Sequence, residues 1–198
     1  MKYLDSSLKK YLDELASANP TPGGGGTSAL AAALGIALIA MVARIASRKL
    51  EGGKPRENAE RIVKTLEKIR HDAEETIDLD PKVYQEVMDS YKRAKTEPDA
   101  ARAQAAIETA LGNSFRLQAD LAMLVVMAKG LLAEVKTFAK GSNANDLIVA
   151  GGLLEGAFIG AKATANSNAV YIKDAKKKHH FEQALAELEE KYRKIHFV

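Results

Sequence analysis

Apolar residues recur along this chain at the three- and four-residue spacing of helices that bury one face. Prolines, glycines and acidic residues interrupt the pattern at intervals, as helix ends require. No segment alternates apolar and polar residues as a half-buried strand would, so the chain is predicted to be all-α. The expected helices cover residues 3–17, 27–49, 57–76, 80–94, 100–138, 146–174 and 178–194, with a candidate interruption at 112–113.

The connections between these expected helices are short. Short connections place successive helices side by side in opposite directions, which predicts an antiparallel up-and-down bundle. No linker or repeat divides the sequence, so residues 1–198 are expected to form a single helical domain. Asp80, followed by Pro81, and Asp146 stand at the expected starts of two helices, where an aspartate commonly caps the first turn.

One stretch, residues 19–43, carries no charge although 28% of the chain is charged. Its apolar run from Ala29 to Ala43 would be about 22 Å long as a helix, short of the roughly 30 Å hydrocarbon layer of a membrane. It is therefore expected to be a buried core helix. Small residues recur in it and in a second helix, where Gly152, Gly156 and Gly160 are four apart, which favours tight helix packing within or between subunits.

Charge and composition limit the classes of partner and the kinds of site that this chain is expected to have. The 29 basic and 26 acidic residues are intermixed, so neither nucleic acid nor a membrane surface is an expected partner. The absence of cysteine excludes disulfides, thiol catalysis and thiolate metal sites. The four histidines form no metal-binding motif, and we expect neither a metal nor a prosthetic group. The first residues lack the layout of a signal peptide, which favours a cytoplasmic protein.

Four glycines, Gly23 to Gly26, directly precede the uncharged helix. They would leave the first N–H groups of that helix uncovered at the positive end of its dipole, which makes a site for an anion or a carbonyl oxygen. A flexible turn without a ligand explains the same residues equally well. A nucleotide-binding P-loop is excluded, because no lysine precedes the hydroxyl residue and no strand precedes the glycines.

Polar residues stand at both ends of the expected helix 146–174. Asp146, Thr164 and Asn168 share one face with several alanines. Asp146 and Asn168 would lie about 33 Å apart on a straight helix, so they can act on one ligand only if a second subunit contributes. Each also has a structural interpretation, Asp146 as a helix cap and Asn168 as the hydrogen-bonding partner of a neighbouring helix.

Three segments resemble the cyclodeaminase/cyclohydrolase family, which includes the C-terminal domain of formiminotransferase-cyclodeaminase and the methenyltetrahydrofolate cyclohydrolases. They are PTPGGGGTSALAAALGIALIAMVARIA, DPKVYQEVM and NDLIVAGGLLEGAFIGAKATANSNAVYIKD, in the family's order and within residues 1 to about 175. The chain departs from the family pattern at Gly26 and Asn145, where serine is usual, and at Thr164, where asparagine is usual.

The resemblance implies a homodimer or larger homo-oligomer of helical subunits that binds a tetrahydrofolate derivative at the subunit interface. Two reactions are implied: cyclisation of 5-formiminotetrahydrofolate to the 5,10-methenyl form with loss of ammonia, which we favour, or hydrolysis of the methenyl form. A formiminotransferase is a partner to consider for the first. The remaining alternative is a folate-binding helical bundle without catalysis.

Both reactions move protons at a one-carbon centre and need an acid/base group. Asp146 is the first candidate for that carboxylate and Asp80 the second, with Asn168 orienting substrate or water. The segment from Pro22 through Gly23, Gly24, Gly25 and Gly26 would hold a polar atom of the pterin or a carboxylate of the glutamate tail. Lys49 would pair with that tail, or is simply an exposed lysine at a helix end.

Overall fold

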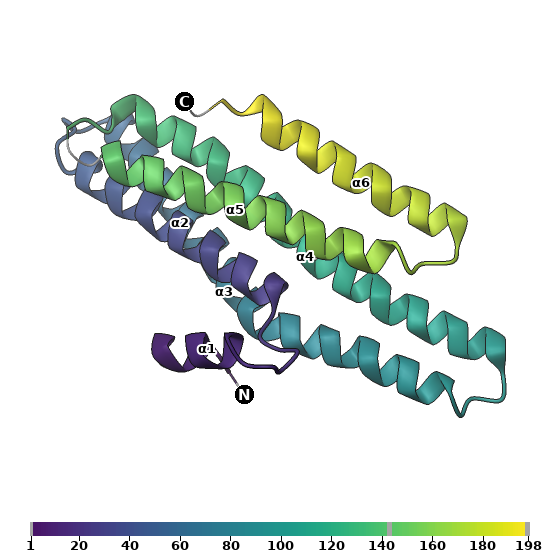
Figure 1. The fold of residues 1–198 in the computed structure, drawn as a ribbon. Helices are drawn as coiled ribbons and strands as arrows, with labels where there is room; N and C mark the ends of the chain where they lie inside the picture. Colours follow the sequence, from purple (N-terminus) through teal and green to yellow (C-terminus); the bar gives the residue numbers. More distant parts are fainter. Residues whose placement is uncertain (1, 142–143, 197–198) are drawn as a thin grey trace.

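The computed structural model describes residues 2–141 and 144–196, and throughout these ranges every regular element is a helix (Figure 1). The all-α prediction is therefore confirmed for the described residues. The helices are α1 (Leu8–Leu15), α2 (Gly24–Ser47), α3 (Lys54–Ala94), α4 (Ala100–Phe138), α5 (Ala144–Ala169) and α6 (Ala175–Lys194).

Helices α2 to α5 form an up-and-down bundle. Each packs against the next in the chain or against its diagonal neighbour, and α5 returns to pack on α2. Helix α6 covers α4 and α5, while the short α1 lies beside the beginning of α2 (Figure 1). Tyr11 of α1 is buried there, with its hydroxyl 3.3 Å from the hydroxyl of Thr27 on α2. The predicted antiparallel bundle is thus what the chain forms.

The uncharged helix α2 is a core helix. Ile36, Ile39 and Val42 are fully buried, and the small residues between them let the backbones of α2 and α5 approach closely. A Cβ on Gly35 would stand 3.2 Å from the carbonyl oxygen of Ala150 on α5. Helices α2 and α5 are long and apolar enough to cross a membrane, but by length and composition alone, and α2 has most of that apolar stretch inside the bundle.

Helix α3 corrects one sequence expectation. It runs unbroken through Pro81, so the helices expected at 57–76 and 80–94 are one, and Asp80 is not an N-cap. A proline inside a helix removes one hydrogen bond and costs about 3 kcal/mol. That cost is offset because α3 buries apolar residues on both sides of the proline, including Ile77 before it and Val87 after it.

Several helix ends also differ from the expected ones. Helix α2 begins at Gly24, so three of the four glycines form its first turn rather than a loop before it. Helix α4 continues through Gly112, which lies against Lys177 of α6. Helix α5 begins at Ala144, which places Asp146 inside its first turn and not at the cap.

The C-terminal helices end and begin earlier than expected. Helix α5 ends at Ala169, and α6 follows with Asp174 as its N-cap. The Asp174 carboxylate accepts hydrogen bonds from the backbone N–H groups of Lys176 at 2.9 Å and Lys177 at 3.1 Å. Aspartate at this position satisfies N–H groups that the helix itself cannot pair.

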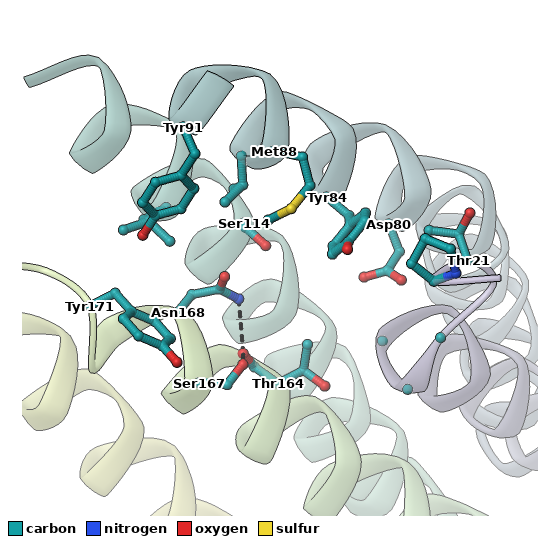
Figure 2. A pocket seen from close by; sticks show the side chains of 16 residues that line it. Thr21, Asp80, Tyr84, Met88, Tyr91, Ser114, Thr164, Ser167, Asn168 and Tyr171 are labelled. Atoms are coloured by element: carbon teal, nitrogen blue, oxygen red, sulfur yellow. Dashed lines mark hydrogen bonds between the residues drawn. The ribbon is translucent and has the colours of Figure 1, made fainter. Parts of the chain in front are cut away.

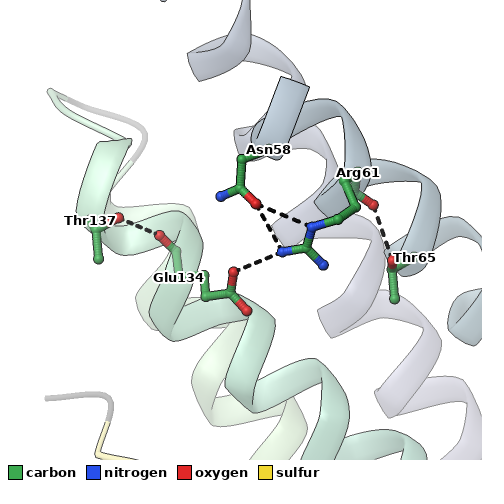
Figure 3. Close-up of polar contacts among 5 residues, drawn as sticks. All are labelled: Asn58, Arg61, Thr65, Glu134 and Thr137. Carbon is green, nitrogen blue, oxygen red and sulfur yellow. Dashed lines mark hydrogen bonds and ion pairs between the residues drawn. The ribbon is translucent and has the colours of Figure 1, made fainter. Parts of the chain in front are cut away.

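Surface polar contacts join α3 to α4 near the end of the bundle opposite the start of α2. Arg61 of α3 donates to Glu134 of α4 at 3.1 Å and to Asn58 on its own helix (Figure 3). Exposed pairs of this kind contribute between 0 and about 1 kcal/mol. They help to define the register of the two long helices, while the buried apolar residues supply most of the stability.

Replacing Gly35 by valine tests the close packing of α2 on α5. The added side chain meets backbone that cannot move aside, so we expect a loss of about 1–3 kcal/mol in the free energy of unfolding. Gly130→Ala is the control, since a Cβ there has no neighbour within 4 Å, and alanine in a helix gains about 0.5–1 kcal/mol over glycine. Urea denaturation measures both. Equal stability of the valine variant and the parent would contradict the close approach.

Candidate functional site

A cleft of about 660 Å³ opens where α2 begins. Helices α3 and α4 continue past the start of α2, so the corner of the bundle that α2 fills elsewhere is empty at this level (Figure 1). The first turn of α2 forms the floor, and the walls come from α3, α4 and α5 with the chain just after α5 (Figure 2). The lining residues are Pro20, Thr21, Gly23, Gly24, Gly25, Asp80, Tyr84, Val87, Met88, Tyr91, Leu111, Ser114, Thr164, Ser167, Asn168 and Tyr171.

The floor of the cleft is a helix N-terminus without side chains. Gly23 is the N-cap of α2 and makes no side-chain capping bond. The first hydrogen bond within the helix runs from Thr27 N–H to the Gly23 carbonyl, so the N–H groups of Gly24, Gly25 and Gly26 have no partner inside α2. These donors lie at the positive end of the helix dipole.

Asp80, which lies on α3, caps the N-terminus of α2. Its Oδ2 accepts a hydrogen bond of 2.9 Å from the Gly26 N–H, the third residue of α2. Its Oδ1 accepts a second of 2.7 Å from Nε2 of Gln118 on α4. The expectation that all four glycine amides are open is therefore wrong for Gly26, while Gly24 and Gly25 line the cleft.

Burial governs the ionisation of Asp80. The residue is only 8% exposed, and desolvation raises the pKa of its carboxyl group above the ordinary value. The hydrogen bonds from Gly26 and Gln118 act in the opposite direction, because they stabilise the charged form. A carboxyl group with opposing influences of this kind, at the edge of a cleft, is typical of an acid/base residue.

Asn168 and Thr164 present polar groups from the opposite wall. The Asn168 Nδ2 donates to the Thr164 carbonyl at 2.9 Å, which leaves its Oδ1 as an acceptor on the cleft side (Figure 2). The Thr164 hydroxyl donates to the Gly160 carbonyl at 2.9 Å, one turn earlier. Both side chains are thereby held in place by their own helix.

Aromatic side chains line the rest of the cleft. Tyr84 lies beside Asp80, while Tyr91 and Tyr171 lie on the α3 and α5 sides, farther from the glycine floor (Figure 2). With Met88 and Leu111 they give the cleft apolar surfaces that suit a flat ring system. Sequence reasoning missed the tyrosines as site residues. Their signal is the spacing of four and seven between Asp80, Tyr84 and Tyr91, which places all three on one face of α3.

The remaining predicted residues are not all brought together. Gly23, Gly24, Gly25, Asp80 and Asn168 line the cleft, whereas Pro22 is buried beside it.

Lys49 and Asp146 lie at the other end of the bundle. Lys49 follows the C-terminal end of α2 and lines a separate hollow of about 260 Å³ near Phe138. Asp146 is half-buried at the start of α5, whereas Asn168 stands at the end of that helix. Within one subunit, neither Lys49 nor Asp146 reaches the cleft.

Among residues 2–141 and 144–196, no three histidine, aspartate or glutamate side chains come together as ligands for a metal ion. The donors that the cleft offers are backbone N–H groups, hydroxyl groups, one amide and one carboxyl group.

Comparison with known proteins adds to this geometry. The formiminotransferase-cyclodeaminase family profile matches residues 7–187. A methenyltetrahydrofolate cyclohydrolase of Methylorubrum extorquens is 29% identical over 187 residues, which are 93% of this chain and 88% of that protein. The mouse formimidoyltransferase-cyclodeaminase is 26% identical over 159 residues, and the chain spans only 29% of that protein.

The fold has a solved counterpart. The crystal structure of a formiminotetrahydrofolate cyclodeaminase from Thermotoga maritima superposes with a TM-score of 0.75 at 28% sequence identity. The match covers 96% of this chain and 92% of that one. The similarity therefore includes the bundle and the helices that build the cleft.

An Asp80→Asn variant tests the burial of the carboxyl group. Because the pKa of Asp80 is raised on folding, its contribution to stability is complete below the unfolded pKa and is lost as the pH rises through the folded pKa. The variant lacks this loss. Its free energy of unfolding relative to the parent should therefore be more favourable at pH 7 than at pH 4, as measured by urea denaturation. If the parent became more stable relative to the variant as the pH rises, the raised pKa of Asp80 would be contradicted.

Proposed function

The chain belongs to the formiminotransferase-cyclodeaminase family and is an enzyme of folate one-carbon metabolism, and we propose that it is a formiminotetrahydrofolate cyclodeaminase whose reaction takes place in the Asp80 cleft. The observation that carries the proposal is the buried Asp80 carboxyl group, which lies beside the N-terminus of α2, where the glycines carry no side chains. A tetrahydrofolate derivative is the substrate, and the reaction as proposed uses neither a metal nor a prosthetic group.

The chemistry needs one group that both accepts and returns a proton. N10 of 5-formiminotetrahydrofolate attacks the carbon of the protonated formimino group (N5–CH=NH2+), which becomes an amino group, and the proton of N10 passes to the Asp80 carboxylate. Asp80 then returns this proton to the amino nitrogen of the tetrahedral centre, and the bond from carbon to that nitrogen breaks. Ammonia leaves and the 5,10-methenyl bridge remains. A buried carboxyl group whose pKa is raised by desolvation suits both steps.

The rest of the cleft fits the substrate. The flat pterin is proposed to lie against the tyrosines, with Asn168 Oδ1 accepting from one of its N–H groups. The free N–H groups of Gly24 and Gly25 would bind an oxygen of the ligand, at the positive end of α2. A formiminotransferase is the class of enzyme that supplies this substrate. We propose that this protein and the formiminotransferase are both cytoplasmic.

Methenyltetrahydrofolate cyclohydrolase is the second candidate, favoured by the similarity to the Methylorubrum extorquens enzyme over most of both chains. The same carboxylate would take a proton from water as the water adds to the methenyl carbon. It would then give the proton to N5 as the bond from carbon to N5 breaks and the added hydroxyl group loses its remaining proton to solvent, which yields the 10-formyl product. The two reactions therefore share one cleft and one acid/base group.

We also propose that two copies pair through α2 and α5. The outer faces of these neighbouring helices expose large apolar side chains, with Ile148, Val149 and Ile159 of α5 between 55% and 66% exposed. Leu34 and Met41 continue the surface on α2. Such a surface on a water-soluble enzyme is typical of a subunit interface.

An antiparallel pair of this kind would give the far end of the bundle a role. Lys49 and Asp146 lie at the end opposite the cleft of their own subunit. In an antiparallel dimer they approach the cleft of the second copy. Lys49 would then pair with the glutamate tail and Asp146 would contribute a second carboxylate.

Replacing Asp80 by asparagine should abolish proton transfer while leaving the shape of the cleft unchanged. We expect kcat to fall by about 10²- to 10⁴-fold, the usual contribution of an acid/base group. The assay follows methenyl absorbance and ammonia release from 5-formiminotetrahydrofolate and, separately, hydrolysis of the methenyl form. Parent protein that changes neither substrate but is stabilised by folate would be a binding protein without catalysis.

The Asp146→Asn variant is the matched comparison. Full activity in this variant with loss in Asp80→Asn assigns the carboxylate to Asp80, and the reverse result would contradict the proposal. If both variants are inactive, they should be mixed and allowed to exchange subunits. Recovery of about a quarter of the parent activity then shows that the two carboxylates come from different subunits of a dimer.

Val149→Lys tests the interface. A charge in the centre of the apolar surface should dissociate the pair, so sedimentation should show a 21.3 kDa species where the parent shows about twice that mass. Met127→Lys is the control, because Met127 is also an exposed apolar residue, at 44%, but lies on α4, which contributes nothing to the proposed surface. A dimer that survives Val149→Lys places the interface elsewhere.

A further inference from the structure

Gln118 is a buried polar residue that packing does not explain. It lies on α4 with no exposed surface, surrounded by the core of the bundle. Its Nε2 donates to Asp80, but its Oε1 is buried and has no hydrogen-bond partner. An unpaired buried carbonyl oxygen is unfavourable, and a leucine at this position would fill a similar volume without that cost.

The orientation of the amide, with its donor toward the carboxyl group, is the one that suits an ionised Asp80. If the amide were rotated by half a turn, Oε1 would face the carboxylate oxygen and the two acceptors would repel each other. With Nε2 toward Asp80 the hydrogen bond is charge-assisted, which is the stronger kind. The unpaired oxygen is thus the consequence of directing a donor at an ionised carboxyl group.

The backbone of α2 leaves space for the side chains of Asp80 and Gln118 at Gly25. A Cβ on Gly25 would overlap both Oδ1 of Asp80 and Nε2 of Gln118. At Gly24 a Cβ would meet only the Thr164 hydroxyl, at an ordinary 3.8 Å. The first turn of α2 therefore leaves room for the carboxyl and amide groups at the one position where they meet.

Among the residues that the structure describes, the other groups around Asp80 offer no positive charge. Tyr11 of α1 and Tyr84 of α3 are the titratable side chains nearby, and α2 contributes only backbone N–H groups. Within the described residues, Asp80 forms no ion pair with a lysine or arginine. Gln118 is therefore the one side chain that donates a hydrogen bond to this carboxyl group among those described.

We propose that Gln118 is a positioning residue for the proposed acid/base reaction: its amide holds Asp80 toward the cleft and stabilises the ionised form that accepts a proton. The glutamine supplies this at the expense of its own unpaired oxygen. Its role is therefore in the ionisation of Asp80 and not in the stability of the bundle. This inference rests on the proposed function only for its effect on turnover.

The test replaces Gln118 by methionine and by leucine. Removal of the donor leaves Asp80 buried with one hydrogen bond fewer, so its midpoint of titration should move to higher pH. Activity at pH 7 should fall by about tenfold and recover in part as the pH is raised. Below the Asp80 midpoint, where the carboxyl group is protonated, the melting temperature should stay close to that of the parent, and above it the variants should lose stability because the charge is buried with one donor fewer.

Gln104→Met is the matched control. Gln104 lies on the same helix and also donates to a carboxylate, Glu108, at 3.1 Å, but outside the cleft. This variant should leave both the Asp80 titration and the pH profile unchanged. A similar change in both variants would show that the effect is not specific to the Asp80 pair.

The titration is followed by NMR of the ¹³C-labelled Asp80 carboxyl group, which does not depend on turnover. In the unmodified protein the side-chain N–H signals of Gln118 should change with the same midpoint as Asp80. An unmoved Asp80 midpoint in the methionine and leucine variants, or Gln118 signals that ignore the Asp80 titration, would overturn the inference. Protein that shows the coupling but turns over no folate would keep the inference for Asp80 and end the proposed function.

Discussion

The contact on which the site depends is the hydrogen bond from the first turn of α2 to Asp80 on α3. A helix that begins with glycines has no side chain of its own to pair its first N–H groups. Asp80 supplies the missing acceptor from 54 residues away in the sequence. This contact ties the start of α2 to α3, and it holds the carboxyl group where the floor of the cleft meets the α3 wall. The start of α2 and the proposed acid/base group thus share one interaction.

The remainder of the site follows from that arrangement. Gln118 on α4 completes the partners of the carboxyl group, and Asn168 on α5 faces it from the opposite wall. Each of the four bundle helices contributes at least one of these groups, so none of them forms the site alone. Because the helices pack through small residues such as Gly35, their relative positions are closely determined. The precise placement that the proposed acid/base chemistry requires is therefore supplied by the core.

Helical periodicity was enough to predict the all-α bundle and the uncharged core helix, because both depend on spacing within one segment. The expectation failed at Pro81, where local preference favours a helix start and burial on both sides of the proline overrides it. Asp80 was a candidate carboxylate because of the family resemblance, whereas its expected structural role as the cap of its own helix was wrong. Gln118 gave little signal, since a lone glutamine in an apolar helix acquires its meaning only from a residue 38 positions earlier.

The late start of α2 also sets the depth of the cleft. The walls of the cleft belong to helices that run past this point, and its floor is the turn at Gly24. One more helical turn before that glycine would fill about 5.4 Å of the open corner, and one turn fewer would open the same length. The position of this one helix end thus determines how deep the cleft is. A change in that position would alter the depth and leave the surrounding walls unchanged.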